Sequence, residues 1–218
     1  MRAMTKLAEP EKLRTLKHRW GRTVEIWVAY QVFLNDEVKI GPAFTCINRD
    51  LAKQTTHTLL TCYYSYLFSL FDRSGINFEE ISAELVVNAS HKASEVRTLI
   101  LEHWEDIRSP MTQIRNNIGF HGAVKEKGKS LGYSAYFSIH PFSSEYIMTL
   151  MRVFFRLMEE VYESAETIAR QVNPGEIDLL MEQAKLTKQM IENSAEDFAI
   201  EPILTIANLD EDGNGYVN

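Results

Sequence analysis

The sequence predicts an all-α fold, an up-and-down bundle of four principal helices with additional short helices. Four long segments repeat apolar residues at the three- and four-residue steps of a helix, whereas strand signals are few and short. The composition, 45% hydrophobic and 24% charged, is that of a globular protein. We expect a helical domain over residues 1–172, an extra C-terminal helix over 173–193, and an acidic, irregular tail over 194–218.

The first two long helices are expected over Pro10–Leu34 and Asn48–Phe71, where leucine, tyrosine and tryptophan side chains form one apolar stripe on each. Gly75 is expected to stand just past the end of the second helix as its C′ glycine. A short helix should follow over Asn77–Val87, because Asn77 and Glu80 have the spacing of a capping box.

A third long helix begins near Ser90, and the pair Ser109-Pro110 is expected to interrupt it, with the serine as a new N-cap. A separate helix would then run from Pro110 towards Gly119. The last long helix carries the strongest apolar stripe, and we expect Ser143 or Ser144 to cap its start.

The apolar runs and the cysteine content predict a cytoplasmic protein without a membrane-spanning segment, and the charge is concentrated at one end. The seven acidic residues after Lys188 account for the whole net charge of −7, so the preceding body is neutral and can still bind an anion locally. Two cysteines, Cys46 and Cys62, are too few for a disulfide framework. No apolar run approaches the ~18 residues needed to cross a bilayer, and the N-terminus lacks the apolar centre of a signal peptide.

The most informative segment is Arg115-Asn-Asn-Ile-Gly-Phe-His121, an arginine and a histidine separated by five residues in an otherwise helical chain. This pattern, with the polar Asn116 directly after the arginine, resembles the signature of the HEPN superfamily. The preceding run from Tyr64 to Asp72 also resembles abortive-infection-type HEPN proteins of bacteria. The resemblance covers residues 10–172 and leaves the acidic tail outside.

The resemblance implies an endoribonuclease of toxin or phage-defence type that needs no metal or other cofactor and leaves 2′,3′-cyclic phosphate ends. It also implies a homodimer, in which the motifs of two copies share one cleft, and an antitoxin or regulatory protein as a further partner. Arg115, Asn116 and His121 would be the catalytic residues.

The residue types suit this chemistry. Arginine presents a planar fork that stabilises charge on phosphate oxygens, and histidine has a pKa near ~6.5 that suits proton transfer near neutral pH. Asn117, four residues before His121, is a candidate local partner of the histidine and a candidate RNA-binding residue. Three lysines follow the motif with one acid among them, and we expect them to bind the RNA backbone: Lys125, Lys127 and Lys129.

Two other interpretations stay open. Arg115 is also compatible with a surface ion pair and His121 with the polar end of a helix, so the alternative function is a non-catalytic helical dimer module that binds RNA or a protein partner. Near the C-terminus, Asp210, Asp212 and Asn214 match the first positions of a calcium-binding loop, but the chain ends before the bidentate glutamate of that loop. We therefore expect an acidic turn there rather than a metal site.

Overall fold

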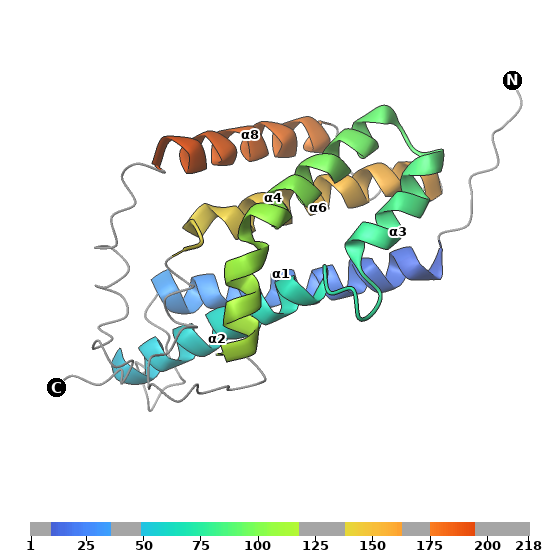
Figure 1. Ribbon diagram of the computed structural model, residues 1–218. Coiled ribbons are helices and arrows are strands. Elements are labelled where there is room, and N and C mark those ends of the chain that lie inside the picture. The colour runs from blue at the N-terminus through green and yellow to red at the C-terminus, as the bar shows by residue number, and fades with distance from the viewer. Residues whose placement is uncertain (1–9, 36–48, 118–137, 163–174, 195–218) are drawn as a thin grey trace, which may run out of the picture. The chain divides into compact units, whose positions relative to one another are not determined.

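The computed structural model describes residues 10–35, 49–117, 138–162 and 175–194. Over these ranges the chain is helical and contains no strand, so the predicted all-α class is confirmed. The elements are α1 (Glu11–Asn35), α2 (Arg49–Ser69), α3 (Phe78–Leu85), the 3-10 helix η1 (Val86–Asn88), α4 (His91–Asn117), α6 (Pro141–Tyr162) and α8 (Glu176–Ser194) (Figure 1). None of the helices in these ranges is both long and apolar enough to cross a membrane.

The chain divides into two compact units, and neither is continuous in sequence. Unit 1 contains the start of α1 up to His18, residues 70–107, and the part of the chain that carries α6 and α8. Unit 2 contains the rest of α1, all of α2, and α4 from Arg108 onward. Two helices, α1 and α4, therefore contribute residues to both units.

Aromatic contacts join α3, α4 and α6 in the core of unit 1. The rings of Phe71 and Trp104 stack with their centres 4.3 Å apart, and Phe78 meets Phe154 edge-on at 5.1 Å. A charged side chain is also buried in the described part of unit 1: Glu159 is 7% exposed and accepts a hydrogen bond from Arg156 at 2.6 Å. Lys17 of α1 lies 3.0 Å from the other oxygen of this carboxylate, so both charges that meet the buried Glu159 are positive.

In unit 1, α8 packs along α6, and the two helices run in opposite directions (Figure 1). The side of α8 that faces the protein buries Ala184 and Thr187. Near one end of the pair, Arg152 and Arg156 of α6 form ion pairs with Glu176 of α8. The start of α6 therefore lies beside the end of α8, where His140 and Ser194 are in contact.

The described part of unit 2 buries apolar side chains of α2 and α4. Tyr63, Leu67, Met111 and Ile114 are each at most 1% exposed. The guanidinium of Arg19 on α1 donates a hydrogen bond to the carbonyl of Ser69, the last residue of α2. This contact satisfies one of the carbonyl groups that the end of a helix leaves without an intrahelical partner.

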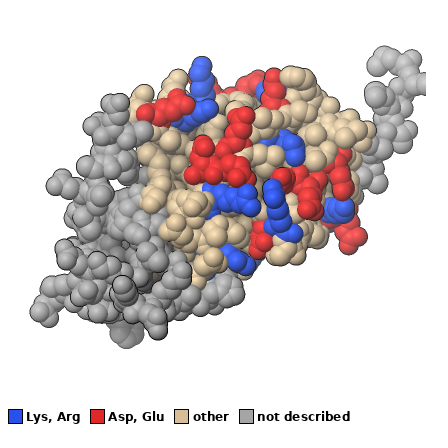
Figure 2. Space-filling model, viewed as in Figure 1, with Lys and Arg blue, Asp and Glu red and all other residues tan. Residues whose placement is uncertain are grey.

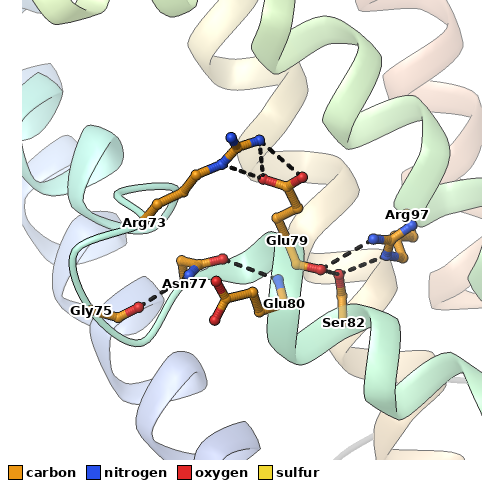
Figure 3. Close-up of polar contacts among 7 residues, drawn as sticks. All are labelled: Arg73, Gly75, Asn77, Glu79, Glu80, Ser82 and Arg97. Carbon is orange, nitrogen blue, oxygen red and sulfur yellow. Dashed lines mark hydrogen bonds and ion pairs between the residues drawn. The ribbon is translucent and has the colours of Figure 1, made fainter.

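A polar network fixes the start of α3 (Figure 3). As predicted, Asn77 is the N-cap: its side-chain oxygen accepts a hydrogen bond from the amide of Glu80 at 3.0 Å. Arg73 forks onto the carboxylate of Glu79 at 2.9–3.1 Å. From α4, Arg97 donates to the Ser82 hydroxyl at 2.9 Å and to the Glu79 carbonyl at 3.1 Å, which ties α3 to α4.

Three predicted boundaries were wrong. Gly75 is not the C′ residue of α2, which ends six residues earlier at Ser69, and the only described glycine with positive φ is Gly175. Ser109-Pro110 does not divide two helices, because α4 continues through the proline. Pro110 lacks an amide hydrogen, and this removes one hydrogen bond of the α4 ladder.

The start of α6 also differs from the prediction. Its N-cap is His140 rather than Ser143 or Ser144. Both serines lie within the first turn of the helix, and both are buried. The amide of Phe142 donates to the His140 ring at 3.2 Å, and the amide of Ser143 donates to the His140 carbonyl at 2.9 Å. Pro141 then occupies the first helical position, where a proline costs no hydrogen bond.

Candidate functional site

The Arg-to-His motif begins in the last turn of α4, and the structure describes part of it. Arg115 and Asn116 lie on the helix within unit 2, Arg115 half-buried and Asn116 exposed. Asn117 is the last residue of α4, and its side chain is outside the described residues, as is all of His121. The structure therefore gives the position of the arginine end of the motif alone.

Arg115 is held in place by two neighbours. Its guanidinium carbon lies 5.1 Å from the centre of the Phe68 ring on α2, a cation–π distance, and its Nη1 donates to the Asn116 side-chain oxygen at 3.3 Å. Arginine is suited to such a place because its planar guanidinium can lie against an aromatic ring and can also form paired hydrogen bonds through its N–H groups. This arrangement suits a group that grips a phosphate.

Arg108, in the first turn of the unit 2 part of α4, lies on the same side of the helix as Arg115. Seven residues turn an ideal helix through about 700°, so the two side chains project within about 20° of each other. Both are half-buried, whereas Met111 and Ile114 occupy the buried side of this segment. Between them, Thr112 donates its hydroxyl to the Arg108 carbonyl at 2.7 Å. The end of α4 therefore has a cationic, partly exposed edge directly beside its apolar side.

The remaining predicted site residues lie outside the described ranges: Lys125, Lys127, Lys129, Asp210, Asp212 and Asn214. On the face of the described residues shown in Figure 2, small groups of acidic side chains alternate with basic side chains. This agrees with the neutral body expected from the sequence.

Models of protein families, curated proteins and solved structures provide no match to this chain. The HEPN resemblance therefore remains a prediction that rests on the motif and on the helical fold.

Among the described histidines, His103 is the most enclosed. Its ring meets Tyr146 edge-on at 4.8 Å, and its Nε2 is buried without a hydrogen-bond partner in the part of the chain that the structure describes. Burial lowers the pKa of His103, and Lys188 and His140 lower it further, whereas Asp106 and a hydrogen bond with the backbone of Ser143 act in the opposite direction. A neutral core histidine is the simplest role for this residue.

A second histidine, His140, lies next to a hydroxyl group, since its Nε2 is 2.7 Å from the Oγ of Ser194. This distance would suit a nucleophile with its base. The ring's other nitrogen, however, accepts the amide hydrogen of Phe142, so the neutral ring carries its proton on Nε2 and donates to Ser194. The pair is therefore the wrong tautomer for activating a serine.

Other polar groups have structural roles. Asp72 accepts a hydrogen bond from the amide of Ser74 at 3.0 Å within a turn, and Arg73 pairs with Glu79 at 2.9 Å. In the described ranges no three histidine, cysteine, aspartate or glutamate side chains are grouped to hold a metal ion. Cys62 is a free, half-buried thiol.

Phe68 is the site residue that sequence reasoning did not single out. It lies within the aromatic run of α2, where helical spacing predicts a core or an interface side chain and does not distinguish a platform for a cation. Phe68 directly follows the buried Leu67 and is itself half-buried, so it lies at the margin of the core. This position indicates a role in binding a cation only once the neighbouring residue on α4 is known.

Proposed function

We propose that the chain is a HEPN-type ribonuclease, a helical bundle that cleaves RNA as a homodimer without a metal ion. The observation that carries this proposal is the motif from Arg115 to His121 at the end of α4, with its arginine partly exposed and oriented by Phe68 and Asn116.

The proposed reaction is a transfer within the RNA strand. The 2′-oxygen attacks the adjacent phosphorus, the bond from phosphorus to the 5′-oxygen breaks, and the products are a 2′,3′-cyclic phosphate and a 5′-hydroxyl. One proton leaves the 2′-oxygen and one reaches the 5′-oxygen. His121 would accept the first, and His121 of a second copy would supply the other, which gives a chemical reason for a shared cleft.

Arg115 would stabilise the negative charge that develops on the phosphate oxygens. Its planar fork can make two parallel hydrogen bonds to them, and Asn116 would orient the phosphate or the ring of His121. Lys125, Lys127 and Lys129 would hold the flanking backbone, and this part of the interaction should weaken with salt.

The test is incubation of the purified full chain with total RNA and with tRNA in an excess of EDTA, followed by analysis of the product ends. Cleavage that leaves cyclic phosphate ends and is lost in His121→Ala supports the proposal. The matched control is His91→Ala, because His91 is exposed at the start of α4 and pairs only locally, with Glu95 at 3.1 Å. Cleavage that persists unchanged in folded His121→Ala would refute it.

One observation also fits the alternative, a non-catalytic helical module that binds RNA or a protein partner. The contact of Arg115 with Phe68 lies within one copy of the chain, as it would if the arginine were structural. Purified protein that binds RNA without cleaving any of these substrates, with an affinity unaffected by His121→Ala, would favour this module.

A further inference from the structure

The end of α8 is attached to the start of α6 through a directed chain of hydrogen bonds. The amide of Phe142 donates to Nδ1 of His140 at 3.2 Å, and Nε2 of His140 lies 2.7 Å from Oγ of Ser194. The Ser194 hydroxyl in turn donates to the carbonyl of Met190, one turn earlier on α8.

In this series of hydrogen bonds, the donor and the acceptor of each bond are fixed by chemistry. The amide nitrogen of Phe142 can only donate, so Nδ1 of His140 must be the acceptor and the neutral ring must carry its hydrogen on Nε2. A carbonyl can only accept, so the Ser194 hydroxyl gives its hydrogen to Met190 and receives the one from Nε2. This series of hydrogen bonds is complete only while the imidazole of His140 is neutral.

We propose that this chain, which we call the α8 latch (His140, Phe142 and Ser194), is an acid-sensitive switch that releases the end of α8 from the start of α6. Protonation would place a hydrogen on Nδ1 that points at the amide hydrogen of Phe142. The ring would then have to turn away, which removes the cap of α6 and the link to Ser194 together. The inference is independent of the proposed nuclease activity.

The surroundings also favour the neutral ring. Burial lowers the pKa of His140. The imidazole of His103 interacts electrostatically with His140, and the pKa of His103 itself is lowered by burial and by Lys188 of α8 and raised by Asp106 of α4.

The other titratable groups at this corner are Glu145 and Tyr146 of α6, Glu102 of α4 and Glu192 of α8. Burial raises the pKa of Glu145, so its charge is also disfavoured here. Glu192 interacts electrostatically with Tyr146 and is the acid on α8 nearest in sequence to Ser194.

The direction with pH follows from linkage. A latched histidine with a lowered pKa binds fewer protons than a released one, whose pKa is close to ~6.5. The latch is therefore closed above about pH 6.5 and weakens as the pH falls below it. Within that window a single coupled proton changes the open-to-closed ratio by at most about tenfold per pH unit.

The experiment is hydrogen exchange of the full chain between pH 7.5 and 5, with rates corrected for the intrinsic effect of pH. We expect protection of the last turns of α8 and of the Phe142 amide to fall by up to about tenfold per pH unit below 6.5. In His140→Asn, the side-chain oxygen can still accept from the Phe142 amide, but the side chain is too short to reach Ser194 and does not titrate, so the remaining protection should not change with pH. His91→Asn is the control and should behave as the unsubstituted chain.

Nitrogen chemical shifts of the histidine rings in the unsubstituted protein give a second measurement that does not depend on the folding of a variant. At pH 7.5, His140 should carry its proton on Nε2, and its pKa should lie below the ordinary histidine value of ~6.5. A proton on Nδ1, protection of α8 that does not change with pH, or the same pH dependence in His140→Asn would each overturn the latch.

Discussion

The guanidinium carbon of Arg115 on α4 lies 5.1 Å from the centre of the Phe68 ring on α2. The contact joins two helices of unit 2 at the point where the Arg-to-His motif begins. It gives the arginine a fixed orientation, and it predicts separate effects on activity and stability for changes at its two ends.

Replacing the arginine tests its role on the phosphate. Arg115→Lys keeps the charge but loses the planar fork, and we expect RNA cleavage to fall by about 10²–10³-fold, the usual cost of a lost oxyanion donor. The unfolding free energy should decrease by only about 0.5–1 kcal/mol, which is the contribution of a partly exposed cation–π contact. Single-turnover cleavage and urea unfolding measure the two effects. Arg22→Lys, at an exposed ion pair with Glu25, is the control and should change neither.

Replacing the ring tests whether orientation matters. Phe68→Leu retains an apolar side chain but removes the aromatic face, so Arg115 loses its platform while its charge is unchanged. We expect slower cleavage with nearly unchanged RNA affinity, whereas Phe68→Tyr should be close to the unsubstituted protein. If the leucine variant cleaved at the full rate, the platform would have no part in catalysis.

Stability should fall on mild acidification. Burial lowers the pKa of His57, His103 and His140, so below about pH 6.5 the unfolded chain binds more protons than the folded one. The unfolding free energy should therefore decrease as the pH drops from 7, by at most about 1.4 kcal/mol per pH unit for each of these histidines. The decrease should end once the folded imidazoles are also protonated.

Urea unfolding at several pH values measures this slope. His103→Phe keeps a ring against Tyr146 and removes one titrating group, so its stability should depend less steeply on pH. His91→Asn should leave the slope unchanged, because His91 is exposed. An equal slope in His103→Phe and in the unsubstituted chain would show that His103 does not contribute.

Glu159 should be the most sensitive carboxylate of unit 1. It is 7% exposed and meets both Lys17 and Arg156, so Glu159→Ala removes the carboxylate that these two cations share in a mostly buried place, while Arg156 keeps its pair with Glu176. We expect a loss of about 3 kcal/mol in unfolding free energy. The exposed pair of Glu84 with Lys12, at 3.1 Å, supplies the control, since Glu84→Ala should cost less than about 1 kcal/mol. Similar losses for the two variants would contradict this ranking.

Helical periodicity was sufficient to predict the fold class and the approximate ranges of α1 and α2, because each of these helices repeats its apolar side chains on one side. Local signals were reliable where a residue bonds to its own neighbours, as Asn77 does with Glu80. They failed at Pro110, because a proline inside a long helix and a proline at the start of a new one leave the same sequence pattern.

The start of α6 and the surroundings of Arg115 depend on contacts that sequence spacing does not reveal. A histidine followed by a proline is an infrequent cap, and the serines that follow are stronger candidates by residue type alone. The platform under Arg115 comes from another helix, so no local pattern pairs Phe68 with it. His121 lies outside the described residues, and its geometry stays a prediction.

The discontinuity of unit 1 affects when this unit can fold during synthesis on the ribosome. Unit 1 includes the start of α1, residues 70–107 and the helices α6 and α8. The contact between Lys17 of α1 and Glu159 of α6 can therefore form only after most of the chain has been synthesised. Folding during synthesis cannot complete this unit early, and contacts between such distant segments slow folding in general. A nascent chain that ends after α4 would still expose the apolar sides of α3 and α4, and would be a natural substrate for chaperones.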